Sequence, residues 1–186
     1  MTPDVLERLI AGRRETDSLD FKGPTSWSVK TFVKDILAMA NVIDGGVIIV
    51  GVEDKSFNPI GLTEDQIRSF DIDTMKDQVA SFADPHVTFH CEALQDGEGR
   101  RYIVIEIAPF AEIPVVCSKD FGDVHAGVIY FRSRSGKPAS ARVRNSSDMR
   151  EIIEASIARR SQQLNRVGFT AQNHDMYDFD RELSGL

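Results

Sequence analysis

Alternating and continuous apolar stretches along the chain predict both strands and helices. Residues 18–22 alternate between apolar and polar side chains, which predicts a strand with Leu19 and Phe21 on one face. Residues 28–44 repeat apolar side chains at the helical period, so we expect a helix there. The next stretch, 47–52, is apolar on both faces, which is typical of a strand at the centre of a sheet.

The remaining pattern completes a mixed set of elements. The further elements predicted are a helix over 2–12, a helix over 63–82 with an interruption at 71–74, a hairpin of strands 87–94 and 100–108, short strands at 114–117 and 128–132, and a helix over about 146–160. The last helix is expected to face inward through Met149, Ile152, Ile153 and Ile157. These elements predict an α+β fold, a single domain over residues 1–160 whose mixed sheet has a buried central strand flanked by helices. A polar, acidic tail follows over residues 161–186.

The size and composition of the chain suit one ordinary domain. It has 186 residues, of which 41% are hydrophobic and 27% charged. No apolar run approaches the roughly 20 residues that span a bilayer, and the N-terminus lacks the order of a signal peptide. Only Cys91 and Cys117 are present, so no disulfide framework is predicted. These features indicate a cytoplasmic protein without a membrane partner.

The distribution of charge points to a nucleic-acid partner, although the net charge is −7. Residues 124–147 contain no Asp or Glu, which leaves −12 for the rest of the chain. The five cations of this segment are Arg132, Arg134, Lys137, Arg142 and Arg144. On a strand Arg132 and Arg134 share a face and can contact phosphate, and Tyr130 on that face can stack on a base. The alternative is a solvated segment with a buried Tyr130.

Three carboxylates, Glu15, Asp20 and Asp54, are the candidate chemical group. Asp20 lies on the polar face of a predicted strand beside Lys22, and Asp54 follows the carboxyl end of the central strand, where open α/β sheets place their sites. Converging carboxylates repel one another unless a cation or a proton relieves them. Mg²⁺ or Mn²⁺ is a suitable cation because both prefer oxygen ligands. Acids at strand edges are also commonly just solvated, so spacing alone leaves both interpretations open.

An ordered set of motifs resembles the Schlafen-type AlbA-like domain. The motifs are Glu15-Thr-Asp-Ser-Leu-Asp20-Phe21-Lys22, Ala38-Met39-Ala40-Asn41, Gly45-Gly46, Gly51-Val52-Glu53-Asp54, Ile60-Gly61, Tyr130-Phe131-Arg132 and Ser135-Gly136-Lys137-Pro138-Ala139. The resemblance extends from about residue 10 to residue 157. It implies a nucleic-acid-binding domain, and some members of the family are metal-dependent endoribonucleases that act on tRNA and rRNA.

The resemblance assigns roles to individual residues. The three acids of the ribonucleases fall on Glu15, Asp20 and Asp54, which would hold Mg²⁺ or Mn²⁺ while Lys22 steadies the site or a phosphate. The family usually has Glu, one methylene longer, where this chain has Asp20. The ribonucleases add a second related lobe, so a homodimer is expected here. RNA is favoured over DNA. The alternative is a non-catalytic regulatory module that binds DNA or a nucleotide such as ATP and acts through a protein partner on the tail.

Several other motifs are expected to be structural. Gly45 and Gly46 do not belong to a G-x-x-x-x-G-K-[ST] run, so we expect a helix end and a tight entry to a strand instead of a phosphate cradle. Asn41 is expected to bond the backbone at the end of its helix. The His and Cys side chains, namely His86, His90, Cys91, Cys117 and His125, match no compact zinc pattern.

Overall fold

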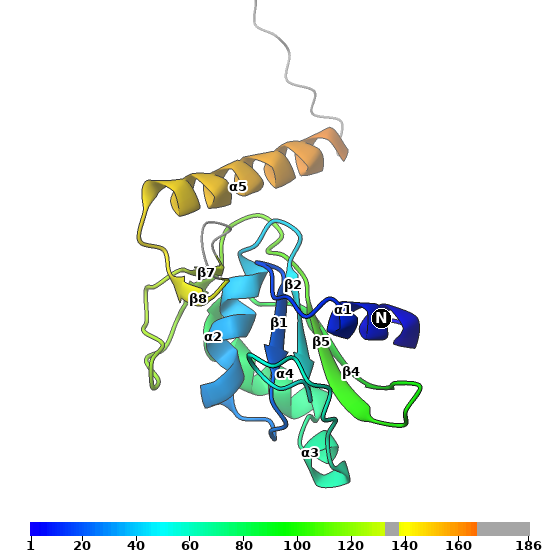
Figure 1. Cartoon of the computed structure of the whole chain (residues 1–186). Coiled ribbons are helices and arrows are strands. Elements are labelled where there is room, and N and C mark those ends of the chain that lie inside the picture. The colour runs from blue at the N-terminus through cyan, green and yellow to red at the C-terminus, as the bar shows by residue number, and fades with distance from the viewer. Residues whose placement is uncertain (133–137, 167–186) are drawn as a thin grey trace, which may run out of the picture.

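Four strands form a mixed β-sheet in the order β1-β2-β5-β4 (Figure 1). The computed structural model describes residues 1–132 and 138–166. Its helices are α1 (Pro3–Ala11), α2 (Val29–Ala40), α3 (Glu64–Arg68), α4 (Ile72–Ala80) and α5 (Ser146–Arg166). Its strands are β1 (Leu19–Lys22), β2 (Gly46–Val50), β3 (Ala83–Asp84), β4 (Phe89–Gln95), β5 (Arg101–Ile107), β6 (Val116–Cys117), β7 (Tyr130–Arg132) and β8 (Ser140–Arg142).

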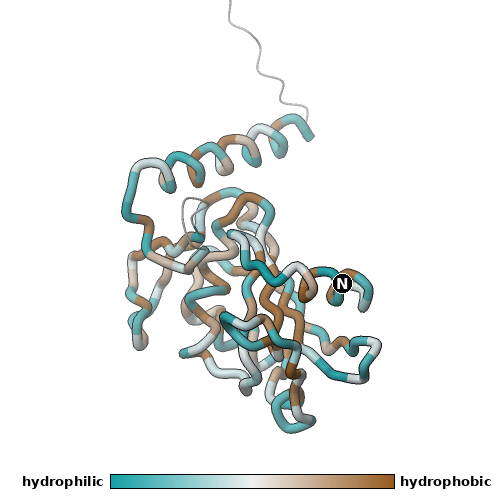
Figure 2. The backbone as a smooth tube through the Cα atoms, in the orientation of Figure 1, coloured by the Kyte–Doolittle hydropathy of each residue, from teal (hydrophilic) through white to brown (hydrophobic). Residues whose placement is uncertain are grey.

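The sheet confirms the predicted α+β class and the position of the central strand. β2 pairs in parallel with β1 and antiparallel with β5, and β4 and β5 form the predicted hairpin. Because neighbours cover both edges of β2 and packed layers cover both of its faces, its continuous apolar sequence is explained. Figure 2 shows apolar residues running through the strands of this sheet.

Each face of the sheet has its own apolar cluster. On β2, Ile48 and Val50 pack toward α2, whereas Ile49 packs on the opposite side with Leu6 and Ile10 of α1. The smaller cluster also contains the apolar residues of β1, Leu19 and Phe21. The opposite face of β1, with its polar side chains, is therefore turned toward α2.

Two small antiparallel sheets complete the α2 side. β3 pairs with β6, and β7 pairs with β8. The sequence pattern did not predict β3 or β8, because neither short stretch alternates. β7 and β8 both contact α2, and Arg132 of β7 bonds Asp20 on the polar face of β1, so this strand pair covers that face.

The helices agree with the predictions at one break and differ at two other places. α2 ends at Ala40 with Asn41 at its C-cap, before the predicted end at residue 44. The predicted interruption after residue 70 is a true break: Asp71 caps α4 by accepting a hydrogen bond from Thr74 N at 2.9 Å. The inward face predicted for the last helix is wrong for most of its positions. On α5 Ile152 and Ala155 are buried, but the other three predicted residues are exposed, namely Met149, Ile153 and Ile157. The reason is that α5 lies across one end of the body instead of against the sheet (Figure 1).

The predicted boundary at residue 160 falls within α5, which continues to Arg166. The rest of the predicted tail, 167–186, lies outside the described residues. No helix in the described part of the chain is long and apolar enough to cross a membrane.

Candidate nucleic-acid interface

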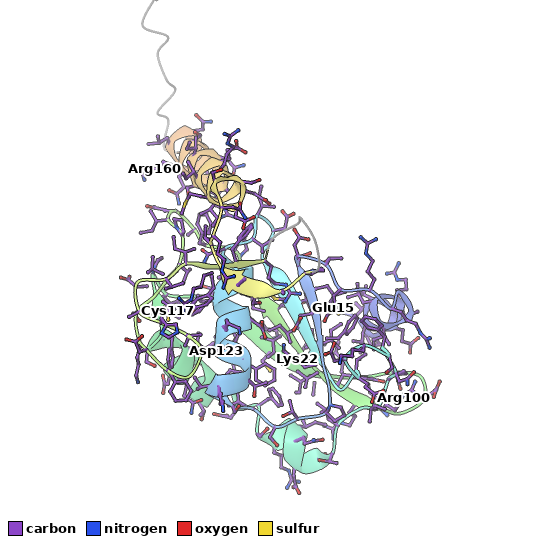
Figure 3. The ribbon with its side chains drawn as sticks, turned by 60° about the vertical axis from the view of Figure 1, so that its left-hand side comes forward. Glu15, Lys22, Arg100, Cys117, Asp123 and Arg160 are labelled. Atoms are coloured by element: carbon purple, nitrogen blue, oxygen red, sulfur yellow. The ribbon has the colours of Figure 1, made fainter. Side chains whose placement is uncertain are left out.

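A hollow of about 410 Å³ opens between β1, α2 and the segment that leads into β8. Its charged lining includes Glu15, Asp20, Lys22, Asp35, Asp54 and Arg132. The three carboxylates singled out from the sequence therefore line one hollow, although they come from separate segments of the chain. Glu15 and Lys22 lie near one another beside β1 in Figure 3.

Asp20 is the centre of an ion-pair network inside this hollow. The side-chain alternation of β1 turns Asp20 toward α2 and β7, where it is only 5% exposed. Its Oδ1 accepts a hydrogen bond from Arg132 Nη1 at 3.0 Å, and its Oδ2 lies 2.8 Å from Lys22 Nζ. Lys22 Nζ also lies 2.7 Å from Oδ2 of Asp35 on α2. The network thus links β1, α2 and β7.

The structure corrects the expected roles of Arg132 and Tyr130. Arg132 is 1% exposed, and its Nη2 donates to the backbone oxygens of Thr16 and Leu19 at 3.2 and 3.4 Å. Tyr130 is equally buried, and its hydroxyl oxygen accepts from His125 N at 2.9 Å. Neither side chain faces solvent, so neither is placed to contact a phosphate or to stack on a base. Arg132 instead fastens β7 to the start of β1.

The carboxylates of Asp20 and Asp35 stabilise the charged form of Lys22. Burial acts to lower the pKa of Lys22, but the charges of Asp35 and Asp20 outweigh it and raise the pKa above its ordinary value. Lys22 is therefore a permanent cation at the floor of the hollow. Its side chain is 25% exposed, so it is still reachable from solvent.

The surroundings of Glu15 raise the pKa of its carboxyl group. Desolvation by burial raises the pKa of Glu15, the hydrogen bond from Phe21 N to its Oε1 at 3.2 Å opposes that shift, and the nearby charge of Asp20 adds to it. A carboxylate whose ionised form is disfavoured in a hollow is typical of a functional position.

The raised pKa of Glu15 predicts how the free energy of unfolding changes with pH. A carboxyl group whose pKa is raised by folding favours the folded state below its unfolded pKa and loses that contribution as the pH rises through the folded pKa. We therefore expect Glu15→Gln to have a melting temperature equal to or above that of the wild type at neutral pH. The difference should shrink as the pH falls toward about 4, where the unfolded carboxyl titrates. Thermal unfolding followed by circular dichroism checks this, and a variant clearly less stable at neutral pH would contradict it.

Asp54 lies in a tight loop after β2, at the rim of the hollow. Val52 bridges to Pro59, which closes the loop. Lys55 and Phe57 take left-handed φ angles of 74° and 55°, a conformation that costs a residue with a Cβ about 1–2 kcal/mol. The ring of Phe57 packs edge-on against Phe21 at 5.7 Å. This contact holds the loop, and with it the exposed Asp54, beside β1.

The comparisons with known proteins agree with this architecture. Residues 15–140 match the family described as Schlafen, AlbA_2. This chain belongs to the Schlafen AlbA_2 family. The match begins at Glu15 and ends at Ser140, so the AlbA_2 region contains the whole lining of the hollow.

Solved structures show the same fold. A crystal structure of the DIP2311 protein from Corynebacterium diphtheriae superposes with a TM-score of 0.53 at 20% sequence identity. The superposition covers 78% of this chain but 27% of that one, so the chain spans about a quarter of the DIP2311 protein. At this identity the likeness extends to the fold alone. No curated protein matches the chain.

The carboxylates of this AlbA_2 domain do not fit a divalent ion as their side chains lie. Both oxygens of Asp20 are bound by cations, namely Arg132 and Lys22. Within residues 1–132 and 138–166, no group of three or more His, Cys, Asp or Glu side chains is placed to hold a metal ion. The repulsion that a metal would relieve at Asp20 is relieved by the protein's own cations. The His and Cys side chains of the described residues likewise form no such group. Cys91 and Cys117 are free thiols.

The sequence interpretation missed three charged residues of the hollow. Asp35 is a buried acid on the otherwise apolar face of α2, and that break in the pattern was the available signal. Lys30 and Lys34, one turn apart on the same helix, also line the hollow. The sequence interpretation did not single them out, because they are two isolated cations on an amphipathic helix and belong to no basic run.

Besides Arg132, four cations were predicted to bind nucleic acid, and the structure describes two of them. Arg142 and Arg144 are exposed, on β8 and just after it. Ser140 lines the hollow, and Arg142, two residues along the strand, points to the same side. Arg134 and Lys137 lie outside the described residues.

The glycine pair is structural, as expected, but Gly45 does not end the helix: α2 ends at Ala40 with Asn41 at its C-cap, and Gly45 lies in the turn that leads into β2. Gly45 has a φ of 73°, and a Cβ there would lie 2.2 Å from the Ile107 oxygen. A Cβ on Gly46 would lie 2.6 Å from Met39 Sδ. Gly45 is therefore required by the close turn between α2 and β2, Gly46 packs directly against the Met39 side chain, and neither glycine lines the hollow.

Proposed function

We propose that this AlbA_2 domain binds nucleic acid, with RNA favoured over DNA, along the hollow between α2 and β8. The observation that carries the proposal is the clustering of reachable cations there: Lys22, Lys30 and Lys34 line the hollow, and Arg142 follows Ser140 on its far wall. Phosphate contacts by such side chains give affinity without sequence preference. Family membership and the location of the hollow inside the matched region support the same function.

Metal-dependent cleavage of structured RNA is the finer form of this proposal. Its support is that Glu15, Asp20 and Asp54 line the same hollow from three separate segments. The ion pairs of Asp20 count against it. The Mg²⁺ or Mn²⁺ requirement therefore rests on the family resemblance, and only a cleavage assay decides it.

One experiment separates binding, cleavage and the regulatory alternative. The protein is incubated with total tRNA, with rRNA and with single-stranded DNA, with Mn²⁺ or with EDTA, and both bound complexes and cleavage products are measured. We expect complexes with RNA in both conditions. Cleavage only with Mn²⁺, lost in Asp54→Asn, would establish the nuclease. Absence of any complex would contradict the proposed function and favour a regulatory module that binds ATP or a protein partner.

A homodimer remains part of the proposal, because the related ribonucleases use two lobes. The exposed apolar side chains of α5 support a contact there; they are Met149, Ile153, Ile157 and Leu164. Light scattering on the samples prepared for binding gives the mass with and without RNA. A monomer in both would remove the dimer from the proposal without affecting the binding site.

A further inference from the structure

We propose that Lys30 and Lys34, on the exposed side of α2, hold a phosphate group of bound single-stranded RNA at the rim of the hollow, without a divalent ion. This assignment rests on the proposed nucleic-acid-binding function and names the residues that make its central contact. It replaces Arg132 and Tyr130, which the sequence favoured, with residues on a different element.

The cations deepest in the hollow already have partners. Arg132 is engaged by Asp20 and by two backbone oxygens. Lys22 is bound by Asp20 and Asp35, both of which are nearly buried. Two acids and two bases thus neutralise one another. A phosphate that entered the hollow would meet its main uncompensated positive charge at the rim.

Lys30 and Lys34 provide that charge. They are four residues apart, so they lie one above the other on one helix face, with Thr31 beside them; all three line the hollow. Lys30 is exposed and has no ion-pair partner among the described residues. Lys34 pairs with Asp123, whose side chain is 59% exposed. A surface pair of this kind is worth little, so a phosphate can take the place of Asp123.

The N-terminal end of α2 adds to the attraction. Ser28 caps the helix, and the first turn contains no acidic residue. The positive end of the helix dipole is therefore not offset by a side chain of its own turn, and it lies beside Lys30. Among the described residues, two acids of the hollow form no ion pair, Glu15 and Asp54; they come from the segments before β1 and after β2, not from α2. Their repulsion would direct a polyanion toward α2.

The test compares two variants that change the net charge equally. Lys30→Ala/Lys34→Ala removes the proposed contact, and Lys76→Ala/Lys119→Ala removes two exposed lysines that do not line the hollow. The affinity for a fluorescently labelled single-stranded RNA is measured by anisotropy in EDTA over a range of salt concentrations. Thermal unfolding shows that each variant is folded, and Lys30→Arg/Lys34→Arg restores the charge.

The expected result is a loss of affinity of about tenfold or more in Lys30→Ala/Lys34→Ala at low salt. Its salt slope should be shallower by about 1.4, since each phosphate contact with a single strand contributes roughly 0.7. The control pair should change affinity less than about twofold, and the arginine variant should bind like the wild type. Adding Mg²⁺ should give no gain in affinity.

Three outcomes would overturn the inference while leaving the proposed function in place. If the wild type binds but Lys30→Ala/Lys34→Ala matches the control pair, the contact is not on α2. Loss of binding in Arg142→Ala/Arg144→Ala alone would place it on β8 instead. Binding by the wild type that requires Mg²⁺ would refute the metal-free contact. Failure of the wild type to bind any RNA would instead refute the proposed function itself, and the inference with it.

Discussion

Asp20→Asn is expected to lower the free energy of unfolding by about 3–5 kcal/mol, because it leaves the buried guanidinium of Arg132 without its counter-charge. Arg132 is 1% exposed and Asp20 5%, so solvent cannot replace the lost partner. Lys22 also loses one of its two carboxylates, although it keeps Asp35. Urea unfolding at neutral pH measures the effect.

Two further variants identify the cause. Asp54→Asn removes the same charge from an exposed loop and should change stability by no more than about 0.5 kcal/mol. Asp20→Asn/Arg132→Met removes both charges and should recover most of the loss, because replacing a whole buried pair is often close to neutral. If Asp20→Asn costs less than about 1 kcal/mol, or if the double variant is no better, the network does not stabilise the fold as described.

Because Asp20 stabilises the fold, its substitution cannot by itself identify a metal ligand. Loss of nuclease activity in Asp20→Asn would not identify a metal ligand, since the same change loosens β7 and the whole wall of the hollow. Glu15→Gln and Asp54→Asn are cleaner probes, because within residues 1–132 and 138–166 neither residue forms an ion pair that joins the buried strands.

Asn41→Ala is expected to lower the free energy of unfolding by about 3 kcal/mol or more. The Asn41 side chain is 1% exposed; its Nδ2 lies 2.9 Å from both the Val115 and Tyr130 oxygens, and its Oδ1 accepts from Val115 N at 2.8 Å. Truncation would strand these buried backbone groups, each at a cost of about 1–3 kcal/mol. The side chain thus joins the end of α2 to β7 and to the segment before β6.

Thermal and urea unfolding check this second prediction against an exposed asparagine. Asn58→Ala, in the loop after Asp54, removes an amide on the surface and should have an effect within about 0.5 kcal/mol. Equal effects at the two positions would show that the buried amide of Asn41 does not hold the elements together.

The sheet could be predicted because its sequence patterns are local. The alternation of β1 correctly separated Leu19 and Phe21 from Asp20 and Lys22, and the two-sided apolar run placed β2 at the centre. The expectation that Asn41 bonds backbone was also correct, although its partners on β7 and before β6 are far away in the sequence.

The hollow was only partly predictable, because alternation shows which residues share a face but not what covers that face. From the sequence, the polar side of β1 could be either a solvated edge or a site. In the structure α2 and the β7–β8 pair cover it, which buries Asp20 and draws in Arg132. The same covering explains why the basic segment does not act as one surface: its first cation is internal, whereas Arg142 and Arg144 are exposed.

The most direct test of the nucleic-acid-binding function is the affinity of the wild-type chain for single-stranded RNA, measured in EDTA as the salt concentration is raised from about 50 to 200 mM. The logarithm of the association constant should fall linearly with the logarithm of the salt concentration, with a slope of roughly −0.7 for each phosphate contact. Replacing EDTA with Mg²⁺ should not strengthen binding. No detectable binding at the lowest salt concentration, or an affinity that does not change with salt, would contradict the account.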